Sequence, residues 1–314
     1  MQAIGRIQAS PNPIILAEMS ANNLGNPTGT ASISWSAEGV DLVEVRVGSP
    51  AGPLFSRRGP GDHEKAASWI VDKTVFCLQD VSGGKPLSAD HTLAMVEVAV
   101  STSPELRQRH RLQLERNLVL LYDAMQGGPL AGRYWVIGGL LIGWAREGRI
   151  LSHDLQDGDF GFFREDREKL VASIPRLIDN GFKPLYRHCN NDGDPAAYVF
   201  EKDWTTFDFV EHVRVRGAIR SWNFGTHLEG KETVDIEIVS QVPAFDLAPM
   251  EFLGRTWRKP ADHDAYLRAI YGNWTEPDPD YDSIKDDASI IDIHPRTGSS
   301  DWPVGEVLAG QLRE

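Results

Sequence analysis

The sequence predicts two domains: an all-β sandwich over residues 1–102, followed by a mixed α/β domain over residues 103–314. Three observations predict this division. A chain of 314 residues has the length of about two domains. Apolar and polar side chains alternate in short runs through the first part, which is typical of half-buried strands. Near residue 103 this period of two gives way to apolar residues three and four positions apart, which is typical of helices.

Composition and charge exclude several classes of protein. Hydrophobic residues make up 41% and charged residues 25% of the chain, as in an ordinary globular protein. With 45 acidic and 32 basic residues the net charge is −13, so we expect no nucleic-acid partner, because surfaces that bind nucleic acid need positive fields. Cys77 and Cys189 fall in different predicted domains, which indicates free thiols in a reducing compartment. Neither a signal-peptide pattern nor a long apolar run is found, so we expect a cytoplasmic protein whose contact with any membrane is peripheral.

Short alternating runs define the first domain. Residues 32–36 (SISWS) and 43–47 (VEVRV) alternate polar and apolar side chains, and Gly and Pro clusters separate the runs. About seven short strands in roughly 100 residues resemble an immunoglobulin-like sandwich, in which Trp35 would lie in the core. Further strands are predicted at 69–71, 75–78 and 95–100. We find no catalytic constellation in this domain.

The second domain begins with a helix and continues with mixed elements. Ser103-Pro104-Glu105 is a typical helix start, with a serine cap, a proline in the first turn and an early acid. We predict a mainly irregular segment from Glu276 onward. Further helices are predicted at 140–146, 165–178 and 262–270, and strands at 134–137, 159–163, 197–201, 206–210 and 234–239.

A glycine pair follows the first strand of this domain. Gly138 and Gly139 precede a helix that contains Gly143 and Arg146. Glycines allow a backbone to approach a phosphate closely, and the N–H groups at a helix start favour anions. Taken alone, the pair is more typical of a tight strand-to-helix turn than of a phosphate site.

Carboxylates follow on two later strands. Asp157 and Asp159 stand two residues apart and would project from one face of an extended strand, where they could share a divalent cation such as Mg²⁺. Asp208 lies inside the apolar run TFDFV, and a buried carboxylate needs a partner or a metal. Asp235 and Glu237 form a rival acidic strand.

Together these features are typical of the nucleotidyltransferase fold, in which two carboxylates from one strand and a third from a neighbouring strand hold the catalytic metals. The stretch YWVIGGLLIGWAREGRILSHDLQDGDFGFF resembles the signature of the LicD and fukutin-related phosphotransferases. TFDFVEH (206–212) and EFLGRTWRKPADHDAYLRAIYGNWTEPDPD (251–280) are similar to later segments of that family. The resemblance covers about residues 105–280, and the immunoglobulin-like module lies outside it.

The resemblance implies roles for individual residues. Asp157 and Asp159 would bind Mg²⁺ or Mn²⁺, and Asp208 would be the third ligand or a base toward the acceptor hydroxyl. Arg146 would balance charge on the transferred phosphoryl group. The remaining residues of the donor and cofactor site would be Gly138, Gly139, Gly143, His153, Asp154 and His212.

The activity implied is metal-dependent transfer of a phospho-alcohol from a CDP-linked donor, such as CDP-choline, CDP-ribitol or CDP-glycerol, to a sugar or polyol hydroxyl of a glycan. Two alternatives stay open. One is a GT-A glycosyltransferase, whose two-aspartate motif also holds a nucleotide-sugar pyrophosphate. The other is a catalytically degenerate glycan-binding protein, favoured by Leu155 and Gln156, which interrupt the family's acidic string.

Overall fold

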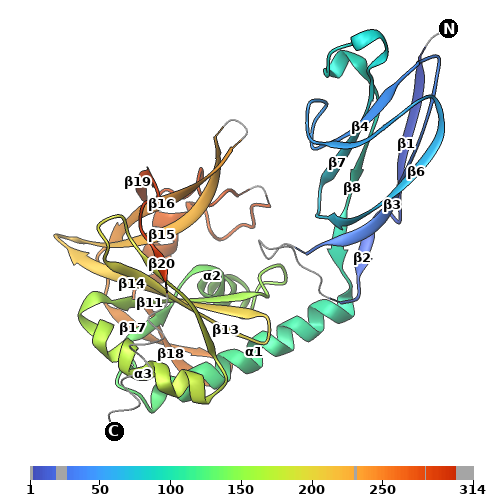
Figure 1. Cartoon of the computed structure of the whole chain (residues 1–314). Coiled ribbons are helices and arrows are strands. Elements are labelled where there is room, and N and C mark those ends of the chain that lie inside the picture. The colour runs from blue at the N-terminus through green and yellow to red at the C-terminus, as the bar shows by residue number, and fades with distance from the viewer. Residues whose placement is uncertain (1–2, 19–26, 230–231, 280, 302–314) are drawn as a thin grey trace. The chain divides into compact units, whose positions relative to one another are not determined.

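The computed structural model describes residues 3–18, 27–229, 232–279 and 281–301. The chain forms two compact units, Met1–Arg109 and His110–Glu314 (Figure 1). The division falls within helix α1 (Pro104–Gln126). The helix begins at Pro104, which confirms the predicted helix start, and Ser103 Oγ caps it by accepting a hydrogen bond of 3.1 Å from the backbone N–H of Leu106. Among the described residues, no helix has both the length and the apolar character needed to cross a membrane.

The first unit is built mainly of β-strands. One sheet has the order β1-β3-β6, a second has the order β5-β4-β7-β8, and β2 pairs with β9 in parallel. In β3 every second residue is buried, and Trp35 packs with side chains of the other sheet, including Phe76, in one core. The alternation predicted from sequence is confirmed, and the immunoglobulin-like topology stays a prediction. The strands are β1 (Ile4–Ser10), β2 (Ile14–Leu16), β3 (Gly29–Glu38), β4 (Val43–Val47), β5 (Leu54–Arg58), β6 (Gly61–Ile70), β7 (Thr74–Asp80), β8 (Thr92–Val98) and β9 (Val100–Thr102).

The second unit combines a large curled sheet with helices. Its main strand order is β19-β16-β15-β14-β13-β12-β20, while β11 pairs with β14 in parallel and with β10 in antiparallel orientation. Strands β17 and β18 form a separate hairpin. The elements after α1 are β10 (Tyr134–Val136), α2 (Gly138–Glu147), β11 (Asp157–Phe163), α3 (Arg167–Asp179), β12 (Lys183–Cys189), β13 (Pro195–Lys202), β14 (Thr205–Val215), β15 (Ala218–Glu229), β16 (Glu232–Pro243), β17 (Leu247–Phe252), β18 (Arg255–Pro260), α4 (His263–Tyr271), β19 (Ile290–Pro295) and β20 (Ser300–Asp301).

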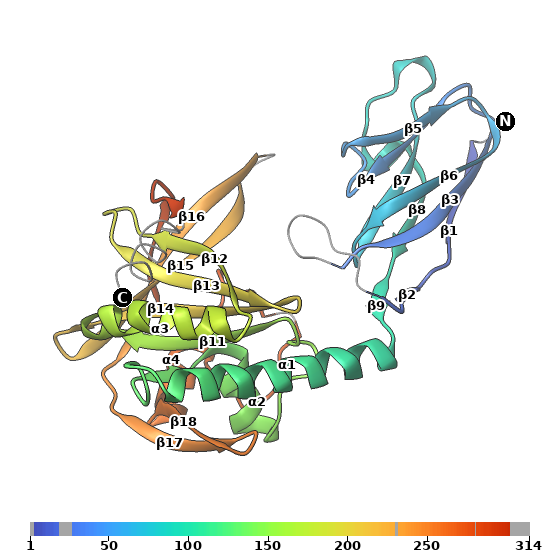
Figure 2. The ribbon, with the colours of Figure 1, turned by 60° about the horizontal axis from the view of Figure 1, so that its bottom comes forward.

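The two faces of β11 and β14 serve different purposes. Phe160 and Phe162 of β11, with Phe207 and Phe209 of β14, join a core that also contains residues of α1 and α3. Figure 2 shows these two helices beside the strands. The residues between the phenylalanines point to the opposite face, because side chains alternate along a strand. The aspartates predicted as ligands lie on that opposite face.

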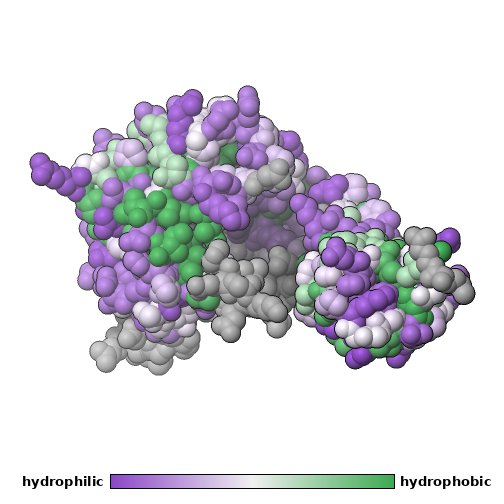
Figure 3. Space-filling view, turned by 90° about the horizontal axis from the view of Figure 1, so that it is seen from above, coloured by the Kyte–Doolittle hydropathy of each residue, from purple (hydrophilic) through white to green (hydrophobic). Residues whose placement is uncertain are grey.

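The second unit contains more strand than the sequence predicts. The prediction of an irregular segment from Glu276 is wrong for β19, which pairs with β16, and for β20, which pairs with β12. Both strands are formed by backbone pairing at sheet edges and are mostly exposed, so their sequences lack the apolar alternation of a half-buried strand. Hydrophilic side chains dominate the surface around the apolar areas that Figure 3 shows.

Candidate active site

Strand β10 leads into helix α2 through the two glycines. Ile137 is extended, and its backbone N–H donates to the carbonyl of Asp159, with an N···O distance of 3.0 Å. Gly138 has a φ of 60°, which residues with a Cβ rarely adopt. A Cβ on Gly138 would lie 2.5 Å from Oδ2 of Asp159, and a Cβ on Gly139 would lie 1.5 Å from Oδ2 of Asp154. The glycine pair therefore lets two carboxylates approach the first turn of α2.

The parallel register of β11 and β14 brings the predicted ligands together. Asp159 lies opposite Asp208, and Asp157 lies opposite Thr206. Because side chains alternate along a strand, Asp157, Asp159 and Asp208 project from the same face. Two carboxylates come from one strand and one from its neighbour.

A fourth carboxylate joins them from the loop between α2 and β11. Asp154 lies against the first turn of α2 and forms a hydrogen bond with the carboxyl group of Asp157. We refer to Asp154, Asp157, Asp159 and Asp208 as the carboxylate cluster. All four residues are partly exposed, so a ligand can reach them.

The carboxylate cluster has an excess of negative charge. Burial, with the hydrogen bond and repulsion from Asp157, raises the pKa of Asp154 to about 8. Burial and repulsion from Asp157 raise the pKa of Asp208 to about 7. Burial raises the pKa of Asp159 well above its ordinary range, and repulsion from the other three aspartates adds to this effect. The neighbouring charges that shift these three groups are all carboxylates, so a cation bound among them would be strongly favoured.

The donor set fits a hard divalent cation. Oδ1 of Asp208 is buried and has no hydrogen-bond partner among the described residues. Carboxylate oxygens are the ligands that Mg²⁺ and Mn²⁺ prefer. Within the described part of the chain, no three acidic, histidine or cysteine side chains already form a metal-binding group. Loading the site would therefore require the carboxylates to turn toward a shared cation.

Tyrosines near Asp159 were not assigned to the site from sequence. Tyr266 and Tyr271 lie on α4, and their pKa values are raised chiefly by burial and further by the charge of Asp159. The ring of Tyr271 lies 5.3 Å from that of Tyr281, between centroids, and the hydroxyl of Tyr281 is buried without a hydrogen-bond partner among the described residues. Tyr271 lies in the segment 251–280 that is similar to the family, but nothing local indicated that it would lie near Asp159.

Two predicted phosphate-site residues lie farther along α2. A Cβ on Gly143 would meet the backbone of Arg149 at 2.6 Å, so this glycine allows close packing of the following loop. Arg146 lies in the last turn of α2, roughly 12 Å along the helix axis from Gly138. Its ion pair is with Glu147, at 3.5 Å. Neither residue is brought to the carboxylate cluster by a contact in the structure.

The two predicted histidines have different environments. His153 is exposed in the loop before β11. His212 is 3% exposed and packs edge-on against Trp135, with ring centroids 5.0 Å apart. Burial lowers the pKa of His212 to about 4. It follows Asp208 by four residues, roughly 13 Å along β14, and belongs to the core rather than to the carboxylate cluster.

The acidic residues of β16, Asp235 and Glu237, do not belong to the carboxylate cluster. Glu237 on β16 is buried and accepts a hydrogen bond of 2.6 Å from the backbone N–H of Asn191. Asp235 is exposed. Glu237 therefore fixes the loop after β12, and the structure favours Asp208 as the partner of Asp157 and Asp159.

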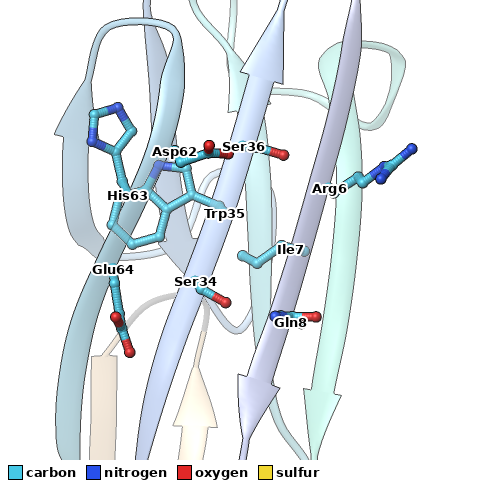
Figure 4. A pocket seen from close by; sticks show the side chains of 9 residues that line it. All are labelled: Arg6, Ile7, Gln8, Ser34, Trp35, Ser36, Asp62, His63 and Glu64. Atoms are coloured by element: carbon cyan, nitrogen blue, oxygen red, sulfur yellow. The ribbon is translucent and has the colours of Figure 1, made fainter.

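The first unit has a polar pocket of its own, of about 550 Å³. Figure 4 shows side chains from β1, β3 and β6 around it. In the sheet register Ser36 lies opposite Asp62 and Ser34 lies opposite Glu64. Hydroxyl, amide and carboxylate groups of this kind suit a ligand rich in hydroxyls. The lining consists of Arg6, Ile7, Gln8, Ser34, Trp35, Ser36, Asp62, His63 and Glu64.

No known protein family, curated protein sequence or solved structure matches this chain. The carboxylate cluster is the feature of the molecule that most strongly indicates an activity. Four acids gathered beside a glycine turn are costly for a folded chain unless a cation joins them, and the buried Oδ1 of Asp208 has no partner in the described part of the chain.

Proposed function

We propose that the second unit is a metal-dependent phosphotransferase of nucleotidyltransferase-like fold, similar to the LicD and fukutin-related enzymes. It would move phosphocholine, ribitol phosphate or glycerol phosphate from a CDP-linked donor to a sugar or polyol hydroxyl. One observation carries the proposal. The parallel register of β11 and β14 places Asp157, Asp159 and Asp208 on one face, beside the glycine turn that starts α2.

The carboxylates have separate roles in this proposal. Asp157 and Asp159 would hold Mg²⁺ or Mn²⁺, and Asp208 would be either the third ligand or the base. When bound, the cation supplies positive charge beside the pyrophosphate of the donor and the departing CMP. Asp154 would orient Asp157 through the hydrogen bond between them. Arg146 is left out, because its place in the last turn of α2 separates it from the cluster.

The proposed transfer forms one bond and breaks another at phosphorus. The acceptor oxygen bonds to the distal phosphorus of the donor, while the bond from that phosphorus to the CMP oxygen breaks. The acceptor proton passes to a base, for which Asp208 is the candidate, since its Oδ1 has no hydrogen-bond partner among the described residues. The products are CMP and an acceptor that carries a phosphodiester.

The first unit would hold the acceptor. We propose that it is an immunoglobulin-like module whose polar pocket binds part of a long glycan, because its Ser, Asp and Glu side chains can exchange hydrogen bonds with hydroxyl groups. Cys77 and Cys189 are both buried and free, which suits the cytoplasm.

A thermal-shift panel tests the proposed donor. CDP-choline, CDP-ribitol, CDP-glycerol, UDP-glucose and GDP-mannose are each added with and without Mg²⁺ or Mn²⁺. A ligand that binds the folded state raises Tm by mass action. We expect a metal-dependent rise with one CDP-alcohol and none with the nucleotide sugars. A rise with a nucleotide sugar alone would indicate a glycosyltransferase, and no rise with any compound would favour a degenerate binding protein.

A further inference from the structure

Aromatic side chains lie on the same sheet face as the carboxylate cluster, two strands away. The register places Asp208 of β14 opposite Val199 of β13, and Val199 opposite Tyr186 of β12. These three residues form a row across the sheet, so Tyr186 shares the face of Asp208. At the usual spacing of neighbouring strands, their Cα atoms are roughly 10 Å apart.

Three rings lie together at this end of the row. The ring centroids of Tyr186 and His188 are 5.7 Å apart, with planes within 15° of parallel. The ring of His188 lies 5.1 Å from that of Phe224 on β15. Tyr186 is 49% exposed, so one ring of this group is open to a ligand. We call Tyr186, His188 and Phe224 the aromatic platform.

A single arginine completes the platform. The guanidinium of Arg296 lies 4.3 Å from the centre of the Phe224 ring. Its Nη2 donates to the carbonyl of Ser299 at 3.1 Å and to Oγ of Ser300 at 2.6 Å, and it lies 3.1 Å from Nδ1 of His188. These contacts fix the guanidinium plane on the ring. Burial and the charge of Arg296 lower the pKa of His188 to about 4, so the histidine is an uncharged aromatic ring at neutral pH.

We propose that the aromatic platform and Arg296 bind the nucleobase of a nucleotide whose phosphates lie at the carboxylate cluster. This inference rests on the proposed function and adds the residues that would recognise the nucleoside. Nucleobases stack on aromatic rings and on arginine planes, and this stacking contributes strongly to binding. The ribose and the first phosphate can bridge the separation between Tyr186 and Asp208. The positive charge of Arg296 also complements an anionic ligand in a protein of net charge −13.

Binding of CMP in the presence of Mn²⁺ tests the inference on the full-length protein. The variant Tyr186→Ala should weaken CMP binding about tenfold in calorimetry, and Tyr186→Phe should restore it, because stacking needs the ring and not the hydroxyl. Ribose 5-phosphate has the same phosphate without a base, and its affinity should be equal in wild type and Tyr186→Ala. Trp204→Ala is the matched control, since Trp204 is 83% exposed and lies in the turn between β13 and β14.

The outcomes separate this inference from the proposed function. Wild-type affinity for CMP in Tyr186→Ala, together with loss of CMP binding in Asp159→Asn, would overturn the platform and leave the carboxylate cluster intact. An equal loss of CMP and ribose 5-phosphate binding in Tyr186→Ala would also overturn it, because the ring would then act on something other than the base. A wild-type protein that binds Mn²⁺ but not CMP would overturn both proposals.

Discussion

Two carboxylates three residues apart on β14 have opposite surroundings. Glu211 is fully buried on the helix-facing side, where Nε of Arg164 and Nε of Arg167 each lie 2.6 Å from its oxygens. Asp208 points to the other face, and the neighbouring charge that shifts its pKa is that of Asp157. The same strand therefore holds one acid that two arginines neutralise and one whose neighbouring charge is that of another carboxylate.

Under the proposed function, this difference is that between a structural acid and a metal-binding one. A buried charge with hydrogen-bonded partners of opposite sign contributes to a fixed arrangement of elements. Like charges placed close together destabilise the fold, and such groups are found at sites where they contribute to ligand binding. The variants below test whether Glu211 and the carboxylate cluster differ in this way.

The largest expected effect is on turnover. Replacing Asp157 or Asp159 with Asn should lower the transfer rate by about a thousandfold or more, because the negative charge that holds the metal is lost. The release of CMP from the donor, followed by ³¹P NMR, measures the rate. Glu211→Gln is the matched control and should keep most of its activity at a temperature where it is folded. Activity near that of wild type in both Asp variants would contradict the mechanism.

The next effect is on stability. Glu211→Gln should lower the free energy of unfolding by about 2 kcal/mol, since it leaves two arginines facing a neutral amide. This value is smaller than for a fully buried pair, because Arg164 and Arg167 keep some exposure. Thermal denaturation should show a fall in Tm of roughly 4–8 °C. An unchanged Tm would show that the ion pairs of Glu211 contribute nothing.

Neutralising an acid of the carboxylate cluster should have the opposite effect on stability from Glu211→Gln. The pKa of Asp208 is raised in the folded state, so its proton contributes stability that is present below about pH 4 and is lost as the pH rises through about 7. In metal-free protein, Asp208→Asn should therefore raise Tm relative to wild type at pH 8 and change it little at pH 4. Saturating Mg²⁺ should stabilise wild type and reduce this difference. A variant less stable than wild type at pH 8 without metal would contradict the account.

The smallest effect concerns the first unit. Replacing Asp62 and Glu64 with Ala should raise KM for a long glycan acceptor by roughly two- to tenfold, the range expected from losing one or two hydrogen bonds. The kcat, and the KM for a short acceptor, should stay unchanged. Initial rates at varied acceptor concentration make the comparison. If the double variant and the wild type have the same KM for the long acceptor, the polar pocket takes no part in acceptor binding.

Local signals account for the parts that sequence could predict. The glycine pair and the predicted strand at 159–163 indicated the β10–α2–β11 unit, because backbone freedom and strand alternation are visible within a few residues. Ser103 and Pro104 likewise indicated the start of α1. The alternation in β3 placed Trp35 in a core, as the structure shows.

Long-range pairing accounts for the parts that no local pattern specifies. The alignment of Asp159 with Asp208 depends on the register between strands about 50 residues apart, and we expected these residues to meet only because of the family resemblance. The edge strands β19 and β20 form by backbone pairing and are mostly exposed. Tyr271 approaches Asp159 only through the packing of α4, so its place near the cluster had no sequence signal.

Binding of Mn²⁺ is the measurement that tests the central claim most directly. Electron paramagnetic resonance counts free and bound Mn²⁺ during a titration of the full-length protein at pH 7.5. The account predicts saturable binding in wild type and in Glu211→Gln, and its loss in Asp159→Asn and Asp208→Asn. A wild-type protein that leaves Mn²⁺ free, or Asp variants that bind it as wild type does, would contradict the account.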